Sequence, residues 1–142
     1  MKIVILFVML LIVSLIYEYM IPGTYYTLPM KVTIVNESKK IGVATGEELN
    51  FGNLPLKASS RKRIDVNNTS NLPIEITLEI NGNISKIAYV NPSWFILGPK
   101  EGKNVEVGVS TNGSYSYGTY IGNLSITGDY SVRSLLLQLV RR

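Results

Sequence analysis

An uncharged apolar run at residues 3–17 divides this chain of 142 residues into two parts. A helix drawn through the run is apolar on every side, so it does not fit a helix with one buried and one solvent-facing side. If the helix continues through Ile21 to Pro22, it reaches the roughly 20 residues that cross a bilayer. We therefore expect residues 1–23 to form a signal-anchor helix.

The charges that flank this run predict its orientation. Lys2 precedes the run, Glu18 follows it, and no further Lys or Arg occurs before Lys31. Because positively charged flanks stay in the cytoplasm, we expect a single-pass protein of the cell membrane with its N-terminus inside and its C-terminal domain outside. A cleaved signal peptide is the alternative, since the apolar core is short. The residues after Glu18 lack the small-x-small pattern of a cleavage site, which favours an uncleaved anchor.

The rest of the chain has the size of one domain and lacks the residues of the commonest active sites. There is neither cysteine nor histidine, which excludes disulfides, thiolate metal sites and Ser–His triads. The carboxylates are dispersed and match no calcium-loop pattern. Without a nucleophile–base pair to nominate, we expect no enzyme activity, no cofactor and no metal. The net charge of +4 is mild, and the basic residues 61–63 fit a solvated strand start better than a nucleic-acid site.

Alternation of apolar and polar residues follows the helix break at Pro22. It is clearest from Ile74 to Ile80, where Glu75 and Glu79 fall on the solvent side. Candidate strands separated by turn residues lie at 31–35, 41–45, 48–51, 63–67, 74–80, 84–90, 94–97, 105–109, 119–127 and 132–140. This spacing predicts an all-β fold, an immunoglobulin-like antiparallel β-sandwich of seven or eight strands in residues 37–142. Residues 24–36 are expected to be a juxtamembrane linker, chiefly at 25–29, and a candidate first strand.

Four segments carry a layout found in a known family. They are Leu49-Asn50-Phe51-Gly52-Asn53-Leu54-Pro55, residues 61–71, residues 92–105 and residues 118–124, which begin Gly118-Thr119-Tyr120. This layout resembles the Ig-like domains of the ASH and major-sperm-protein superfamily, and the related modules of archaeal and bacterial surface proteins. Ser70 stands where the family pattern has glycine, and residues 98–102 are a stretched form of its hairpin. The resemblance implies an adhesion, scaffolding or presentation module, and it carries over no catalytic residue.

Asparagine motifs support an exported surface. The chain has six Asn-x-Ser/Thr acceptors, where chance would give roughly two. We therefore expect a glycoprotein, although turns in β proteins also favour these residue types. The adjacent acceptors Asn67 and Asn68 are too crowded for both to carry a glycan. The candidate acceptors are Asn36, Asn67, Asn68, Asn83, Asn112 and Asn123.

One candidate partner surface lies in the strand at 94–97. Trp94 and Ile96 share a face there, and they are exposed if Phe95 and Leu97 point into the core. A register slip of one residue would exchange the faces and bury Trp94. Both registers are open at this point.

A second candidate surface is the Ser/Gly-rich loop that contains Tyr115 and Tyr117. Tyrosine interleaved with small polar residues is typical of binding loops, and a plain flexible connection is the alternative. Tyr120, which follows the loop, has the position of a tyrosine corner, whose hydroxyl bonds to a nearby backbone group.

These features together predict a membrane-anchored extracytoplasmic Ig-like binding or structural module of the cell envelope. Its Cys-free, Ile/Tyr/Asn-rich composition indicates an archaeon. The expected partners are the membrane, through the N-terminal helix, and an envelope or filament protein, with no nucleic acid. The alternative is an accessory, stator-type or strand-donating subunit of an archaellum or pilus-like filament. In that case residues 30–35 would be donated to a neighbouring copy, giving a homo-oligomer by strand exchange.

Overall fold

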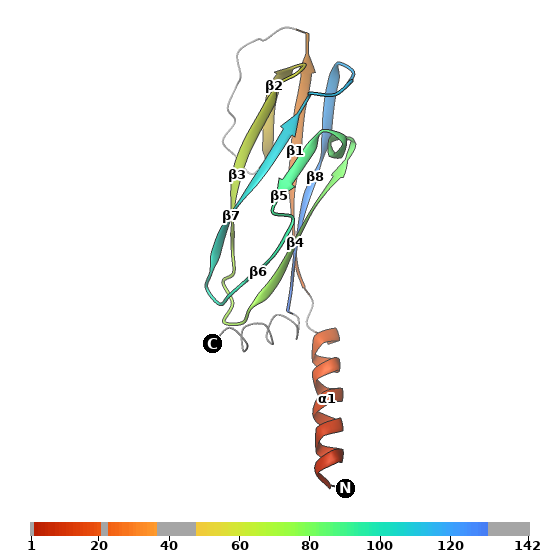
Figure 1. Cartoon of the computed structure of the whole chain (residues 1–142), viewed down its shortest axis with the longest axis vertical. Coiled ribbons are helices and arrows are strands. Elements are labelled where there is room, and N and C mark those ends of the chain that lie inside the picture. The colour runs from red at the N-terminus through yellow and green to blue at the C-terminus, as the bar shows by residue number, and fades with distance from the viewer. Residues whose placement is uncertain (1, 21–22, 37–47, 131–142) are drawn as a thin grey trace.

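The computed structural model describes residues 2–20, 23–36 and 48–130, which form one α-helix and eight strands in two sheets (Figure 1). The five-stranded sheet has the order β2-β1-β8-β4-β6, and the three-stranded sheet has the order β3-β7-β5. The candidate strands at 41–45 and 132–140 lie outside the described residues. The elements are α1 Lys2–Met20, β1 Thr24–Val35, β2 Leu49–Pro55, β3 Ser59–Asn67, β4 Ile74–Gly82, the 3-10 turn η1 Asn83–Lys86, β5 Ala88–Asn91, β6 Trp94–Leu97, β7 Gly102–Ser110 and β8 Gly118–Asp129.

The fold is mostly β, as the alternation predicted. Its two sheets contribute to one hydrophobic core. Alternate residues of the central strands supply the core, because successive side chains of a strand point to opposite faces. In β4 the buried side is that of Ile76 and Leu78, while Glu79 is exposed, as expected. The fully buried side chains of the facing strands β1 and β7 are Val32, Val105, Val107 and Val109, and Met30 and Ile34 are almost so.

Strand β1 is longer than the sequence indicated. The linker expected at residues 25–29 is wrong, because this stretch is the first half of β1 and pairs antiparallel with β8 from Thr24 to Ile34. On its other side, β1 pairs with β2 in parallel, starting at Met30. That pair departs from the antiparallel arrangement we expected; the other strand pairs of the described residues are antiparallel.

Between β4 and β7 the chain changes sheets repeatedly. The return strand expected at 84–90 is instead η1 followed by β5, which pairs with β7 in the smaller sheet. Ile84 and Ile87 are 0% and 5% exposed. Because both side chains are buried in the core, the backbone turns inward here and does not run back along β4. Strand β6 then returns to the larger sheet beside β4.

Helix α1 extends beyond one end of the sheets, where β1 begins and β8 ends (Figure 1). We call this the proximal end, and the end that carries the β7–β8 loop the distal end. From Val4 to Val13 the apolar side chains of α1 have exposed fractions between 48% and 68%. Among the residues that the structure describes, no helix has both the length and the hydropathy needed to cross a bilayer.

Candidate functional site

Strand β6 has the register that exposes its tryptophan. Phe95 and Leu97 are 5% and 1% exposed and point into the core, whereas Trp94 is 46% exposed and Ile96 is half-buried. The indole of Trp94 donates to Glu75 Oε1 at 2.6 Å, across the β4–β6 pair. The slipped register, with a buried Trp94, is therefore wrong. The exposed indole lies at the edge of the larger sheet, on its outer face and towards the proximal end.

The two loop tyrosines differ in environment. Tyr115 packs partly against the core, and its hydroxyl donates to the carbonyl of Lys86 at 3.2 Å. Tyr117 is 55% exposed, and its hydroxyl donates to Asn36 Oδ1 at 3.1 Å. Both rings are thus held in place by hydrogen bonds to other segments. Tyr115 is chiefly a packing residue, and only Tyr117 presents most of its ring to solvent.

The four candidate partner residues do not form one surface. Trp94 and Ile96 lie near the proximal end, since β6 pairs with the first residues of β4. Tyr115 and Tyr117 lie at the distal end, because β8 starts there opposite Ile34. A partner of ordinary size that contacts one group would leave the other uncovered.

Five of the six candidate glycosylation acceptors are accessible. Asn36, Asn67, Asn83, Asn112 and Asn123 are all exposed. In two of them the side-chain oxygen accepts a hydrogen bond, in Asn36 from Tyr117 and in Asn83 from the backbone nitrogen of Ile121. Those bonds use the oxygen and leave open the amide nitrogen, which is the atom that carries an N-linked glycan.

Asn68 is the exception, and the prediction of a glycan there is wrong for the folded domain. Its side chain is 3% exposed. The amide nitrogen donates to the carbonyl oxygens of Leu72 and Gly98, both at 2.8 Å. A glycan on this nitrogen would have no room and would replace these bonds. The local motif looked like a surface turn because the burial comes from the β6–β7 turn, which lies about 30 residues further along the chain.

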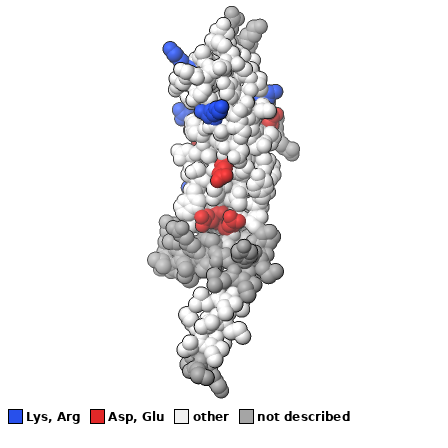
Figure 2. Space-filling model, turned by 90° about the vertical axis from the view of Figure 1, so that its right-hand side faces the viewer, with Lys and Arg blue, Asp and Glu red and all other residues white. Residues whose placement is uncertain are grey.

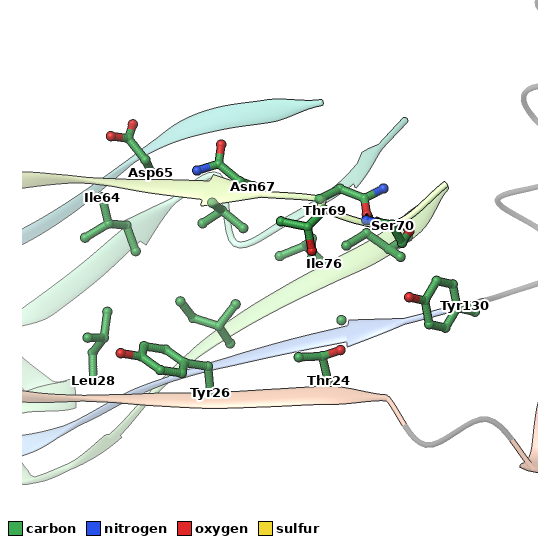
Figure 3. A pocket seen from close by; sticks show the side chains of 15 residues that line it. Thr24, Tyr26, Leu28, Ile64, Asp65, Asn67, Thr69, Ser70, Ile76 and Tyr130 are labelled. Atoms are coloured by element: carbon green, nitrogen blue, oxygen red, sulfur yellow. Dashed lines mark hydrogen bonds between the residues drawn. The ribbon is translucent and has the colours of Figure 1, made fainter. Parts of the chain in front are cut away.

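A cavity of about 260 Å³, which no sequence pattern predicted, lies between the two sheets at the proximal end. Figure 3 shows it between β3 on one side and β1 on the other, with Ile64 facing Leu28 across the gap and Tyr130 at its mouth. Its wall is mainly apolar and comes from β1, β3, β4 and β8, with polar side chains supplied by the loop between β3 and β4. The side chains of Asp65 and Asn67 point away from it (Figure 3). No alternation pattern could reveal it, because the same residues would form a closed core if the sheets met there.

Charged side chains are unevenly distributed over the face seen in Figure 2. Acidic groups lie towards the proximal end and basic groups towards the distal end. Glu75 of β4 and Asp129 of β8 lie directly opposite each other in the register, on the outer face of the larger sheet. Within the described part of the chain, no group of three potential metal-ligating side chains comes together.

The outer face of the smaller sheet carries a packed tyrosine. Tyr89 of β5 pairs with Gly108 of β7, and its ring lies over this glycine so closely that a Cβ atom there would clash with the ring. The Tyr89 hydroxyl donates to Glu106 Oε1 at 3.1 Å, and Arg61 Nη1 lies 3.7 Å from the same oxygen. Partial burial and then the Glu106 carboxylate raise the pKa of Tyr89 above its usual value.

No family model matches the sequence, and no curated protein matches it.

Proposed function

We propose that this chain is a membrane-anchored, extracytoplasmic Ig-like module of the cell envelope that binds or supports another envelope protein. Two features carry the proposal together: the β domain, and a helix at one end of it whose residues from Val4 to Val13 are all apolar. The charges that flank the apolar run at residues 3–17, with Lys2 before it and Glu18 after it, support an outward-facing β domain.

The observation that carries the anchor is the exposure of α1. Ten consecutive apolar side chains, from Val4 to Val13, are at least 48% exposed, and none of them belongs to the hydrophobic core that the described residues form. Removing one such side chain from water is worth about 1.5–3 kcal/mol, so the helix strongly favours apolar surroundings. Lipid supplies these on all sides at once, which suits a helix without a polar face.

Support for a binding or structural task comes from the exposed groups of the β domain. Trp94, Tyr117 and Ile121 are 46%, 55% and 57% exposed, and large exposed aromatic and apolar side chains are typical of contact surfaces. We propose the outer face of the larger sheet, near Trp94, as the partner surface. The five exposed acceptor asparagines fit glycosylation outside the cytoplasm. The same proposal includes the fold and the source. The β domain is an Ig-like sandwich similar to the ASH and major-sperm-protein modules, and the protein comes from an archaeon.

The alternative is an accessory, stator-type or strand-donating subunit of an archaellum or pilus-like filament. Its α1 would be surrounded by apolar helices of other subunits instead of lipid. Strand donation is the weaker form, because β1 lies between β2 and β8 of its own chain and would have to leave both. The tethered module needs no such rearrangement.

The test uses the absence of cysteine, which makes any introduced thiol unique. Lys2→Cys places a thiol at the first residue of α1, and Asn112→Cys places one in the distal loop. A membrane-impermeant maleimide applied to intact cells should label the Asn112→Cys chain and should leave the Lys2→Cys chain unlabelled until the cells are opened. Equal labelling of the two variants in intact cells would contradict the orientation.

Extraction at alkaline pH tests the anchor itself. The full-length chain should stay with the membrane pellet, and Leu10→Arg should reduce this fraction, because a charge at the centre of a span costs about 2.5–3.5 kcal/mol. Leu10→Ile is the matched control and should stay in the pellet. If the unmodified chain is released, the anchor is wrong. If the chain sediments as an ordered polymer after solubilisation, the filament alternative replaces it.

A further inference from the structure

A row of four side chains crosses the outer face of the larger sheet near the proximal end. Tyr25 and Trp94, at its two ends, are 66% and 46% exposed, and the two threonines between them are half-buried. Three strand spacings separate the two ends, so the aromatic residues lie about 14 Å apart. We call this set the Tyr25–Trp94 row. In the register it consists of Tyr25 of β1, Thr127 of β8, Thr77 of β4 and Trp94 of β6.

Hydrogen bonds hold both aromatic rings over this face. The hydroxyl of Tyr25 shares a hydrogen bond of 3.1 Å with Ser125 Oγ. The indole nitrogen of Trp94 donates to Glu75 Oε1 at 2.6 Å. Because each ring is fixed at its polar end, a ligand that covers it restricts little further side-chain motion. The two rings are thus preorganised for contact.

The surface between and beside the rings is polar. The hydroxyls of Thr77 and Thr127 can donate and accept hydrogen bonds, whereas carboxylates only accept them. Carboxylates lie in both adjacent rows of the same face, those of Glu75 and Asp129 on one side and that of Glu79 on the other. In a protein–protein interface, apolar groups form the centre and polar groups form the rim. The order here is reversed, with aromatic groups at the ends and polar groups in the middle.

We propose that the Tyr25–Trp94 row binds a neutral oligosaccharide, displayed as a glycan by an envelope glycoprotein. A sugar ring has a face of C–H groups, which packs on an aromatic ring, and an edge of hydroxyls, which bond to hydroxyl and carboxylate groups. Two aromatic rings about 14 Å apart are spanned by a chain of several sugars and not by a single one. The three carboxylates repel phosphorylated or sulfated chains, which favours a neutral one.

This proposal rests on the proposed function, because it gives the partner surface near Trp94 a ligand of defined chemistry. A single exposed face holds such a chain weakly. Several copies anchored in one membrane would engage several glycans of the same envelope at once, and their combined binding then exceeds that of one face. Glycan binding therefore suits a tethered module.

Binding is measured with the full chain in lipid nanodiscs, made in cells that attach no glycans. The probes are glycans released from the envelope glycoproteins of the cells that produce this protein. They are tagged with an uncharged fluorophore and separated into neutral and charged fractions. Fluorescence anisotropy should show saturable binding of a neutral fraction and about tenfold weaker binding of the charged fractions.

Four variants locate the binding site. Trp94→Ala and Tyr25→Ala should each weaken binding about tenfold, since each removes one aromatic ring from the contact. Thr77→Val keeps the shape of the side chain, removes the hydroxyl and should weaken binding about threefold. Tyr117→Ala is the matched control, because it removes a ring of 55% exposure at the distal end and should leave the affinity unchanged.

The unmodified chain gives a second measurement, which does not depend on the folding of a variant. Trp94 is the only tryptophan, so an untagged neutral glycan should change its emission and shield it from quenching by iodide. The proposal is overturned if no neutral fraction binds, or if Trp94 stays open to iodide when glycan is bound. Equal affinities of Trp94→Ala and Tyr117→Ala overturn it as well.

A protein partner at the same surface would give a different result. The chain would then bind envelope proteins through Trp94 as tightly after chemical removal of their glycans as before. In that case the glycan proposal fails while the proposed function stands. Release of the full chain from membranes at alkaline pH, by contrast, contradicts the anchor alone.

Discussion

The side-chain amide of Asn68 donates to the backbone carbonyl of Gly98 at 2.8 Å, which joins the loop after β3 to the turn before β7. The same nitrogen donates to the carbonyl of Leu72, and the side-chain oxygen accepts from the backbone nitrogen and the hydroxyl of Ser70 at 2.9 and 2.7 Å. Every polar atom of this buried side chain therefore has a partner. The amide thus ties together two loops at the proximal end.

We predict that Asn68→Asp lowers the free energy of unfolding by about 2–4 kcal/mol, because a carboxylate has no N–H for the two carbonyls and would be buried next to them. Asn67→Asp makes the same chemical change at the exposed neighbour and should change stability by less than about 0.5 kcal/mol. Urea unfolding followed by the fluorescence of the single tryptophan, Trp94, measures both. Equal stability of the two variants would show that the Asn68 bonds contribute nothing net.

The same residue shows what the sequence could and could not predict. Alternation located most strands correctly, since strand period is a local property of residues such as Ile74 to Ile80. Burial of Asn68 depends on Gly98, and the sheet change at β5 depends on contacts across the core. Neither is encoded within a window of neighbouring residues. Trp94 was placed on a strand from the sequence, but the face on which it lies was decided only by the packing of Phe95 and Leu97.

A close approach of β4 and β8 requires glycine at position 122. Gly82 and Gly122 are paired in the register, and a Cβ atom on Gly122 would clash with the backbone oxygen of Asn81. Because backbone cannot move as a side chain tip can, Gly122→Ala should cost about 2–3 kcal/mol of stability. Asn123→Ala, at the exposed next residue, is the control and should be near neutral. Thermal unfolding of both variants measures this, and a neutral Gly122→Ala would mean that the strands separate without loss.

Because the Tyr89 ring lies over Gly108, we predict that substitutions at these two residues have non-additive effects on stability. Gly108→Ala should destabilise the protein by about 1–2 kcal/mol, because the new methyl group displaces the ring. In a Tyr89→Ala background the ring is absent, and the same glycine change should cost less than about 0.5 kcal/mol. A double-mutant cycle by denaturant unfolding gives the difference. Additive effects would mean that the backbone around position 108, rather than the Tyr89 ring, is the reason that only glycine fits there.

Two tyrosines should titrate in a defined order. The hydrogen bond from Ser125 stabilises the phenolate of Tyr25 and lowers its pKa, whereas burial and Glu106 raise the pKa of Tyr89. In the unfolded chain both lie near about 10. The Tyr89 contribution to stability is therefore present below that pH and is lost as the pH rises through its higher folded value. The Tyr25 contribution has the opposite sign, being present above about pH 10 and lost as the pH falls through the lower folded value.

NMR of ¹³Cζ-labelled tyrosine, assigned with Tyr25→Phe and Tyr89→Phe, should show Tyr25 titrating first. Between about pH 9 and 11, Tyr89→Phe should flatten the fall in stability seen for the unmodified chain. A reversed order of titration would contradict both assigned causes.

Tyr120 tests the tyrosine corner that the sequence predicted. Its hydroxyl donates to the carbonyl of Ser116 at 3.0 Å, four residues upstream, and so closes the distal loop onto the start of β8. We predict that Tyr120→Phe costs about 0.5–1.5 kcal/mol, the net value of one such bond. Tyr117→Phe also removes one hydroxyl bond, but at a ring that is 55% exposed, where water replaces it at little cost. Chemical denaturation of the two variants should therefore rank Tyr120→Phe as the less stable, and the reverse ranking would assign the ordering of this loop to Tyr117 instead.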